Sequence, residues 1–362
     1  MAASSLKKIA ADLNLSVAAV SAAMGGCGTA RVSEETAARV RAYAQKVNYR
    51  PSLAGKALRS QHLHQIAILV EGDFGEQFRS GPITDFPAIF GLNNFLRDRD
   101  WQLHIIDDCG HRTEQEPLPR YLRERFIDGL VVSSTSEKRN DVLKSDFARF
   151  SIPAIFMNAV GEYNCISIDD HLGACLAARH LIELGHQNIL FVGTASQHYS
   201  IAERKNGYQQ TLKAAGLRPS VYVLEEGHAE ETETYKRRLA RNKESGQRFL
   251  EKAFLKQRPT GIVCYDDRVA LIVMKALYVG GFNVPKDVSI VGFNDMPFMD
   301  MLPVSLTTVR ADFHLIGRLA GELLLDLIQK GDAHLPSPII KPELAVREST
   351  CAVTSTRKNV LS

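Results

Sequence analysis

The first fifty residues carry three short stretches in which apolar and small side chains recur at the spacing of an α-helix. These stretches are 6–13, 17–24 and 34–47, and each follows a serine that suits a helix N-cap: Ser5, Ser16 and Ser33. Asn14 lies between the first two, where a tight turn favours a residue that tolerates positive φ. The pattern predicts three short helices, arranged either as a helix-turn-helix domain or as a small structural bundle.

From residue 63 to residue 350 the pattern changes to short apolar runs that alternate with helical stretches. The runs include 64–72, 102–107, 128–134, 153–158, 188–193, 261–265 and 288–293. Apolar strands that alternate with helices are typical of parallel sheets covered on both faces, and the length allows two such lobes. Ligands of such folds bind outside the carboxyl ends of the strands, so we expect a cleft there.

Charge divides the chain at the same place as the hydrophobic pattern. Residues 1–62 hold nine basic and three acidic residues, a net +6, which leaves −3 for the other 300 residues because the whole chain carries +3. A small basic head on a mildly acidic body indicates that the head binds a polyanion such as nucleic acid. The charge distribution therefore favours the helix-turn-helix interpretation over the structural bundle.

The six cysteines are scattered without a CxxC pair, which disfavours a zinc site or a disulfide framework and indicates thiols in a reducing compartment. The first residues lack the basic-then-apolar pattern of a signal sequence, and no apolar run approaches the ~20 residues of a membrane-spanning helix. We expect a cytoplasmic protein with no membrane contact, no metal and no cofactor apart from a small effector.

The segment 48–60, NYRPSLAGKALRS, resembles the end of the DNA-binding head and the hinge of the LacI/GalR family of bacterial transcription regulators, which typically read NYxPNxxARxLxx. The resemblance implies that residues 52–58 form a short helix only when two subunits lie on DNA, with Leu58 wedged into the minor groove. Gly55 replaces the usual alanine. Glycine costs roughly 1 kcal/mol in a helix interior, so we expect the free hinge to be poorly ordered.

The body resembles the effector domain of the same family over 166–193, 203–217, 258–295, 303–309 and 346–350, in matching order and spacing. The resemblance implies an α/β domain of two lobes, like a periplasmic binding protein, joined by three crossover strands. We expect an all-α helix-turn-helix head at 1–49, a hinge helix and linker at 50–62, an effector-binding and dimerisation domain at 63–350, and a disordered tail at 351–362.

The resemblance and the strand ends together suggest the site residues. Those expected at DNA are Ser5, Leu6, Ser16, Val17, Ala18, Ser21, Ala22, Asn48, Tyr49, Lys56 and Leu58. Those expected at the effector are Phe74, Asn158, Arg204, Asp267 and Asn294. Asp266 stands where the family usually has asparagine, which adds a charge and changes the expected ligand preference. We interpret His180 and His186 as structural residues and not as metal ligands.

Val17, Ala18 and Ala22 occupy positions at which the family places polar side chains against base edges. None of the three can make the bidentate hydrogen bonds that distinguish G or A. We therefore expect weak base discrimination in each half-site and more reliance on thymine-methyl contacts, phosphate contacts and the hinge.

Two segments depart from the family in length. The stretch 71–87 is longer than usual after the first strand, and 224–245 is a charged insertion that we expect to be a solvated helix or loop.

The leading hypothesis is a homodimeric transcription repressor that binds a double-stranded DNA operator under the control of a small effector, with a sugar ranked first. A nucleoside or a sugar phosphate is the alternative effector. A transport-type solute-binding protein is disfavoured by the basic head. An enzyme is disfavoured because the sequence shows no glycine-rich phosphate loop, no G-x-S-x-G and no metal-spaced ligand set.

Overall fold

The computed structural model describes residues 5–24, 32–50, 62–71, 85–108, 126–133, 137–195, 198–224, 235–331 and 334–353. The chain divides into two compact units, one made of Met1–Gln65 with Pro119–Asp128 and the other of the remaining residues. Each unit is described by itself. Among the helices in these ranges, none combines the length and the apolar character needed to cross a bilayer.

The described part of the first unit contains three helices, as the sequence predicts: α1 (Leu6–Leu13), α2 (Val17–Ala23) and α3 (Glu34–Lys46). Asn14 ends α1 in the left-handed region at φ 53°, so the tight turn between α1 and α2 is confirmed. The three helices enclose a small core whose fully buried side chains are Ile9, Val20 and Val40. We call the described residues 5–50 the head.

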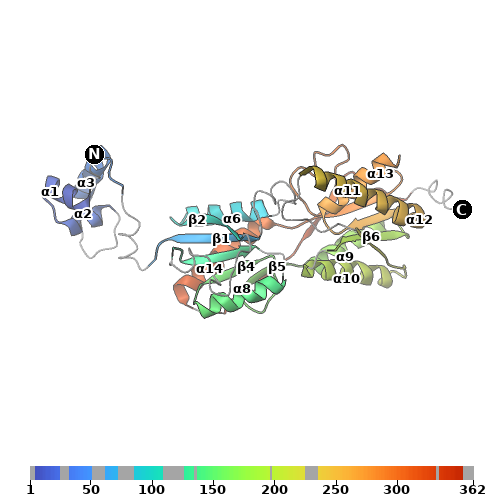
Figure 1. The fold of residues 1–362 in the computed structure, drawn as a ribbon, viewed down its shortest axis with the longest axis horizontal. Helices are drawn as coiled ribbons and strands as arrows, with labels where there is room; N and C mark the ends of the chain where they lie inside the picture. Colours follow the sequence, from blue (N-terminus) through green and yellow to red (C-terminus); the bar gives the residue numbers. More distant parts are fainter. Residues whose placement is uncertain are drawn as a thin grey trace. The chain divides into compact units, whose positions relative to one another are not determined.

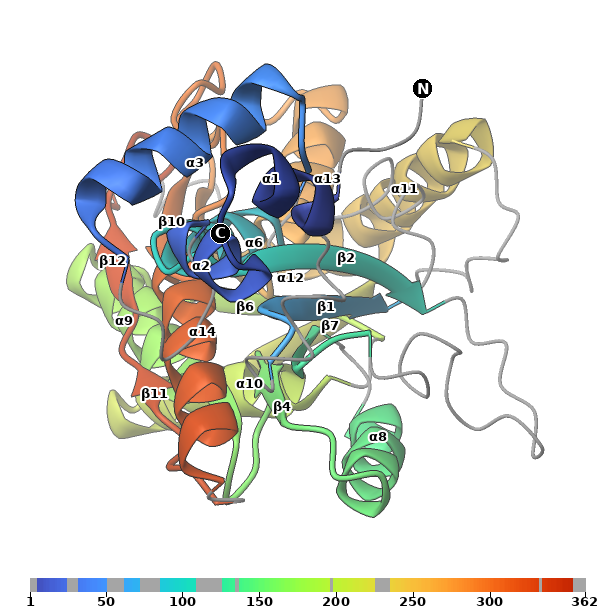
Figure 2. The same cartoon turned by 90° about the vertical axis from the view of Figure 1, so that its left-hand side faces the viewer.

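The first lobe of the second unit is built on a sheet with the strand order β11-β5-β4-β3-β1-β2 (Figures 1 and 2). Its pairs of described register are parallel. The strands are β1 (Gln65–Glu71), β2 (Gln102–Asp108), β3 (Gly129–Ser133), β4 (Ala154–Met157), β5 (Cys165–Ile168) and β11 (Ile339–Ile340).

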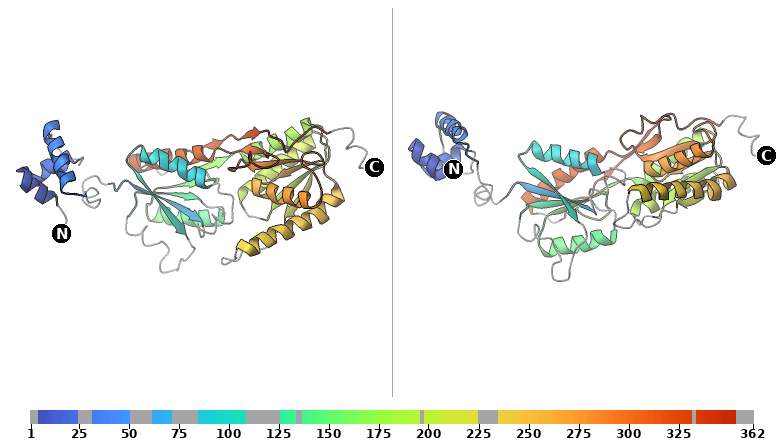
Figure 3. Two further views of the ribbon diagram at one scale, coloured as in Figure 1. Left: turned by 90° about the horizontal axis from the view of Figure 1, so that it is seen from above. Right: turned by 45° about the horizontal axis from the view of Figure 1, so that its top comes forward.

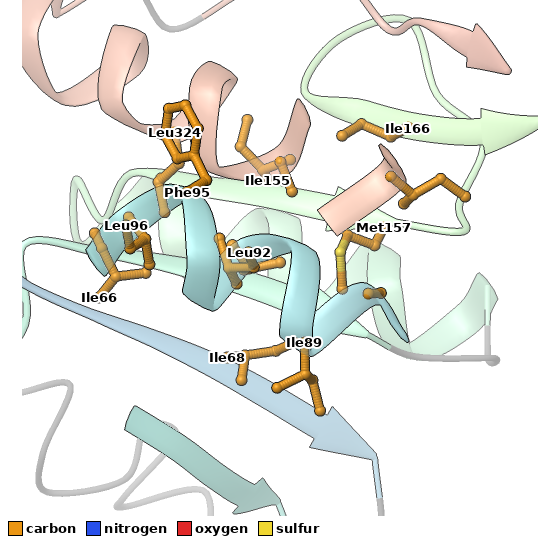
Figure 4. Close-up of a cluster of buried hydrophobic side chains, with 14 of the residues drawn as sticks. Ile66, Ile68, Ile89, Leu92, Phe95, Leu96, Ile155, Met157, Ile166 and Leu324 are labelled. Carbon is orange, nitrogen blue, oxygen red and sulfur yellow. The ribbon is translucent and has the colours of Figure 1, made fainter. Parts of the chain in front are cut away.

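Helices cover both faces of this first sheet. The helices α6 (Asp85–Arg97) and α14 (Phe313–Lys330) pack on one face and α8 (Glu137–Arg149) lies on the other (Figure 3). A hydrophobic core lies between the sheet and the helices α6 and α14. The sheet and both helices contribute side chains to it, such as Ile68 from β1, Leu92 from α6 and Leu324 from α14 (Figure 4).

The second lobe has the strand order β12-β10-β9-β8-β6-β7, parallel except for the pair of β10 and β12. Alternate residues of its strands enter two different cores, because successive side chains point to opposite faces. Leu190 and Val192 of β6 join one core, and Ile189 and Phe191 join the other. The strands are β6 (Ile189–Thr194), β7 (Ser220–Leu224), β8 (Gly261–Cys264), β9 (Ser289–Asn294), β10 (Thr307–Arg310) and β12 (Glu343–Ala345).

Two helix layers supply the cores of the second lobe (Figure 3). The helices α9 (Asp170–Glu183) and α10 (Tyr199–Ala214) contribute to one core. The other core receives α13 (Asp267–Val279) and the end of α11 (Tyr235–Phe249), which continues as a π-helical turn (Leu250–Phe254) and α12 (Leu255–Gln257).

Among the described elements, the chain passes between the two sheets three times. It crosses after β5, returns between β10 and α14, and crosses again between β11 and β12. The expected two-lobed fold with three crossovers is therefore confirmed, and the carboxyl ends of β4, β5, β8 and β9 point toward the crossovers.

Two expectations differ from the structure in their boundaries. The expected tail does not begin at residue 351, because the Cys351 amide donates to Ser289 Oγ at 3.1 Å and the Val353 amide donates to the Leu184 carbonyl at 2.9 Å. Residues 354–362 lie outside the described part. Of the charged insertion at 224–245, the residues from Tyr235 onward belong to α11, whose Ser245 is buried against the second lobe.

The contact between α6 and α14 depends on glycine. A Cβ atom at Gly317 would lie 1.8 Å from the Ala88 carbonyl oxygen, so any larger residue forces the two backbones apart. We expect Gly317→Ala to lower the free energy of unfolding by about 3 kcal/mol or more, at the upper end of overpacking effects. Arg318→Ala, at a partly exposed position on the same helix, is the control and should change it little. Equal urea-unfolding midpoints for the two variants would contradict the close approach.

Candidate functional site

Arg204 of α10 is the centre of a buried polar cluster in the second lobe. Its Nε donates to Asp170 Oδ1 at 2.7 Å, Nη1 donates to the Tyr265 carbonyl at 2.6 Å, and Nη2 donates to Asn294 Oδ1 at 3.3 Å. The guanidinium also stacks on the Phe293 ring, 3.5 Å from its centroid. Burial is the largest single influence and lowers the pKa of Arg204, but Asp170, Tyr265 and Asp266 together raise it by more, so the group stays charged.

The partners of Arg204 lie at or just after the ends of three strands that the fold brings close together. Asp170 follows β5 at the first crossover, Tyr265 follows β8, and Asn294 ends β9. These are carboxyl ends of parallel strands, where ligands of doubly wound sheets bind. Asn294 and Asp295 both have positive φ, at 106° and 52°, and such backbone is concentrated at functional sites.

Asn294 also lines a pocket of about 340 Å³ that lies between the end of β9 and the second crossover. Met296, Arg310, Phe313 and His314 contribute to its walls. The volume is within the usual range for a small-molecule site. We call the region that includes this pocket and the Arg204 cluster the cleft. A larger hollow of about 730 Å³ is mainly apolar and includes the amino-terminal start of β4, so it is not part of the cleft.

Asp267 does not face the cleft as expected. Its side chain is fully buried, with Oδ2 accepting from the Met296 amide at 2.7 Å and Oδ1 accepting from Thr308 Oγ1 at 2.6 Å. Burial raises its pKa to about 7 in spite of these hydrogen bonds. Asp267 therefore holds the loop after β9 in place, and a direct contact with a ligand would require both bonds to break.

The neighbouring Asp266 faces the Arg204 cluster instead. It caps α13, because its Oδ1 accepts from the Val269 amide at 2.7 Å, and its charge contributes to the raised pKa of Arg204. Adjacent residues at a helix start point in different directions, and spacing along the sequence does not decide which of two aspartates faces a cleft. This explains why the sequence alone led to Asp267.

Asn158, which is expected from the sequence at the effector, makes contacts between the two lobes. Its carbonyl accepts from His198 Nε2 at 3.0 Å, and its Oδ1 lies 3.5 Å from the Tyr199 hydroxyl. Since a carbonyl only accepts, His198 Nε2 carries the proton and a neutral ring accepts at Nδ1 from Ser200 Oγ, 2.6 Å away. Ser200 Oγ in turn lies 2.8 Å from the Tyr265 hydroxyl, so this chain of polar groups ends beside Arg204.

His198, Ser200 and Tyr265 are functional-site candidates that sequence reasoning missed. His198 is buried, although a histidine before a helix carries no signal by itself. Its partner Asn158 lies forty residues away along the sequence and in the other lobe, so only the fold brings them together. Phe74 lies outside the described residues. His180 and His186 hold the chain near Thr350 and Cys351, which agrees with the structural interpretation.

In the head, several residues expected at DNA also stabilise the fold. Ser5 and Ser16 cap α1 and α2 by accepting from the Lys8 and Ala19 amides. Asn48 has φ 50° after α3, and Tyr49 packs on the head core.

The outer face of α2 is apolar, as the sequence indicated. Val17 and Ala18 are exposed, and Ser21 and Ala22 are half-buried. Leu6 is half-buried against the head core. Lys56, Leu58 and Gly55 lie outside the described residues.

Side chains of α3 lock the three helices of the head together. The Tyr43 hydroxyl donates to Asp12 Oδ2 of α1 at 2.8 Å, and Arg41 Nε donates to the Ala23 carbonyl at the end of α2 at 3.2 Å. A cation at a helix C-terminus is favourable because it meets unpaired carbonyl groups. The head therefore has its own core and its own side-chain hydrogen bonds between helices. Its helix α2 carries few long polar side chains.

Comparison with known proteins agrees with both parts. Residues 178–350 match the model of a periplasmic binding protein-like domain. The HTH-type transcriptional regulator RegA of Clostridium saccharobutylicum is 27% identical over 353 residues, which cover 96% of this chain and 99% of that protein. The arabinose metabolism transcriptional repressor of Geobacillus stearothermophilus is 29% identical over 279 residues, 73% of each chain.

Solved structures give the same result. A LacI family transcriptional regulator of Mycobacterium smegmatis is 26% identical with a TM-score of 0.63, covering 80% of this chain and all of that one. The lac repressor dimer bound to operator and an anti-inducer is 20% identical with a TM-score of 0.78, covering 97% of this chain and all of that one. Over nearly its whole length the chain is similar to HTH-type transcriptional regulators, and its second unit contains a periplasmic binding protein-like domain. Compared with the LacI/GalR pattern that it resembles, the departures are the apolar outer face of α2, Asp266 in place of asparagine and Asn294 in place of aspartate.

Proposed function

We propose that this protein is a homodimeric transcription repressor whose affinity for a DNA operator is controlled by a small polyhydroxylated effector in the cleft. The observation that carries the proposal is the Arg204 cluster. A buried guanidinium, fixed by Asp170 and Asn294, lies where the carboxyl ends of the strands reach the crossover between the lobes. A ligand at this position contacts both lobes. If the ligand changes the orientation of one lobe relative to the other, that change can be transmitted along the chain to the head through β1.

The chemistry of the cluster favours a neutral polyol over an anion. Forked donors and fixed acceptors suit vicinal hydroxyl groups. Asp170 and Asp266 lie beside Arg204, and Asp295 already accepts from Arg310 and Arg347, so little positive charge is left for a phosphate. We therefore rank sugars above sugar phosphates, with nucleosides between them. The direct contacts proposed are Arg204, Asn294, Asp266 and Asn158, with Asp267 as a positioning residue.

Dimerisation is supported by large apolar side chains that both lobes expose. Phe90 and Ile105 are exposed in the first lobe, and Tyr278, Val279 and Met301 in the second. Exposed apolar residues in both lobes suit an interface that runs along the body, in which two heads can bind one palindromic site.

A thermal-shift screen followed by gel shifts tests the proposal. We expect a sugar or nucleoside to raise the melting temperature of the full chain and to change its affinity for DNA selected from a random duplex pool. A protein that selects no DNA, or a stabilising ligand that leaves DNA affinity unchanged, would contradict the proposal. Stabilisation by sugar phosphates alone would overturn the ranking of effectors.

DNA binding by this protein should depend steeply on salt and only weakly on single bases. Two heads bring twice the net +6, and neutralising six or more phosphates lowers affinity about 10³-fold between 50 mM and 200 mM salt. Val17 and Ala18 offer no bidentate contact to a base. Each single base-pair change in a half-site should therefore cost less binding free energy than the roughly 1–3 kcal/mol that is usual for a mismatch. Lys7→Ala should weaken binding to all half-site variants equally, and Lys330→Ala on α14 is the control. A shallow salt dependence with sharp loss at each base change would be the opposite result.

A further inference from the structure

The larger hollow of the first lobe lies at the amino-terminal ends of the strands of its sheet. It has a volume of about 730 Å³, within the usual range for a small-molecule site. Its walls include the end of α8, the start of β4 at Ala154, the loop before β5 and the end of α14. We call it the α8–α14 pocket. Because the cleft lies at the carboxyl ends of parallel strands, this pocket is a separate space.

Aromatic rings contribute to the floor and the rim of the α8–α14 pocket. Phe147 of α8 and Phe156 of β4 are buried and pack as a tilted pair, with ring centroids 6.3 Å apart. Tyr163 and His334 form a second pair with centroids 4.5 Å apart, and both of these side chains are exposed. Aromatic rings favour offset or tilted neighbours at such separations, so a flat ring that enters the pocket gains contacts beyond the burial of its area.

The ammonium group of Lys144 points toward these rings. Its Nζ lies 5.3 Å from the centroid of the Phe156 ring, and a Cβ atom at Gly161 would lie 3.2 Å from it. Lys144 also lines a smaller pocket of about 160 Å³ beside α8, but Phe156 and Gly161 line only the α8–α14 pocket of the two. The charged end of the side chain therefore belongs to the α8–α14 pocket.

Lys144 has no carboxylate partner within the described part of the chain, although the exposed Glu162 also lines the pocket. Its neighbour is instead the buried thiol of Cys165. Burial raises the pKa of Cys165, and the charge and the hydrogen bond of Lys144 oppose that rise. A neutral thiol does not balance the ammonium charge. A ligand carboxylate can do so through a charge-assisted hydrogen bond, beside walls that are mainly apolar.

We propose that the α8–α14 pocket binds a small aromatic carboxylate, whose ring packs on Phe147 and Phe156 and whose carboxylate pairs with Lys144. An uncharged hydrocarbon would leave Lys144 without a counter-charge, and an inorganic anion would leave the aromatic walls uncovered. This ligand is separate from the effector of the cleft, so the inference does not depend on the proposed function.

Calorimetry on the full chain with matched pairs of probes tests the proposal: phenylacetate with phenylacetamide, cinnamate with cinnamamide, and naphthoate with naphthamide. At least one carboxylate should bind with a Kd below about 1 mM and tenfold or more tightly than its neutral amide. Lys144→Met should remove this preference for the carboxylate, and Lys144→Arg should retain most of it. Arg149→Met, at an exposed position at the end of α8, is the matched control and should leave both affinities within twofold.

Ala148→Trp tests where the carboxylate binds. Ala148 is exposed and lines the α8–α14 pocket, so an indole at this position occupies the pocket without overpacking the core. We expect this variant to lower the affinity for the carboxylate at least tenfold. Arg204→Lys alters the cleft and should leave the same affinity within twofold.

Several outcomes would overturn the assignment. It fails if no carboxylate binds, or if Lys144→Met binds the carboxylate as tightly as the unchanged protein does. Full affinity in Ala148→Trp, or a large loss in Arg204→Lys, would place the binding site elsewhere. A dimer that dissociates in Ala148→Trp, measured by sedimentation, would make this face an interface between copies of the chain and not a ligand site. None of these results depends on a sugar in the cleft, so a failure here leaves the proposed function standing.

Discussion

Arg204→Met is expected to lower effector affinity at least 100-fold and to destabilise the second lobe. The substitution removes the group that binds the ligand and leaves the Asp170 carboxylate buried beside an apolar side chain. Removing one partner of a buried ion pair costs about 3–5 kcal/mol because the remaining charge has no compensation. The loss therefore combines a missing contact with a collapsed arrangement of Asp170, Tyr265 and Asn294.

Arg204→Lys separates the two parts of this effect. Lysine keeps the positive charge near Asp170 but lacks the planar fork that reaches three acceptors at once. We expect its melting temperature to recover most of the loss while effector affinity remains at least tenfold below that of the unchanged protein. Calorimetry with the best ligand of the screen, and thermal unfolding of each variant, check both expectations. Full affinity in either variant would place the effector elsewhere.

Asp267 should make the stability of the protein depend on pH in a direction that is unusual for an aspartate. Burial raises its pKa from 3.8 to about 7, so the folded state holds this proton more tightly than the unfolded state does. Stability therefore falls as pH rises from about 4 to about 7, and levels off above that. A shift of about three units, at 1.36 kcal/mol each, sets an upper limit of about 4 kcal/mol.

Asp267→Asn and Asp267→Ala distinguish a positioning role from direct ligand contact. An asparagine amide can accept from the Met296 amide and donate to Thr308 Oγ1, so Asp267→Asn should retain both bonds and flatten the pH dependence between pH 4 and 7. Asp267→Ala leaves both partners unpaired and should destabilise the protein by about 2–4 kcal/mol at pH 7. Urea unfolding across this pH range measures both effects. Effector affinity should stay within about twofold in Asp267→Asn, and a large loss in that variant would restore Asp267 as a direct contact.

The head is predictable from sequence because its determinants are local. Ser5, Ser16 and Ser33 cap helices within three residues of themselves, and Asn14 adopts the left-handed conformation that a tight turn requires. The strands with continuous apolar runs were also predictable. By contrast, β7 and β12 were not predicted. Both lie at the edges of the second sheet, where most of their side chains are half-exposed, and β12 has only three residues.

The candidate site was predictable only where one residue dominates a motif. Arg204 and Asn294 were found by resemblance, and the structure brings them into one cluster. The choice between Asp266 and Asp267 depends on which of them meets Thr308 and the loop after β9, which is a tertiary contact. His198 and Ser200 could not be found at all, because their importance depends on contacts with Asn158 in the other lobe and with Tyr265, which lies 65 residues from Ser200 along the chain.

The most direct test is the affinity of the full chain for its selected DNA, measured by fluorescence anisotropy without effector and with effector at a concentration that saturates the unchanged protein but not Arg204→Lys. We predict that the effector changes the apparent Kd for DNA at least tenfold in the unchanged protein and less than twofold in Arg204→Lys, while both proteins bind the same DNA equally well without it. An effector-dependent change of the same size in both proteins, or no change in either, would contradict control of the head through the Arg204 cleft.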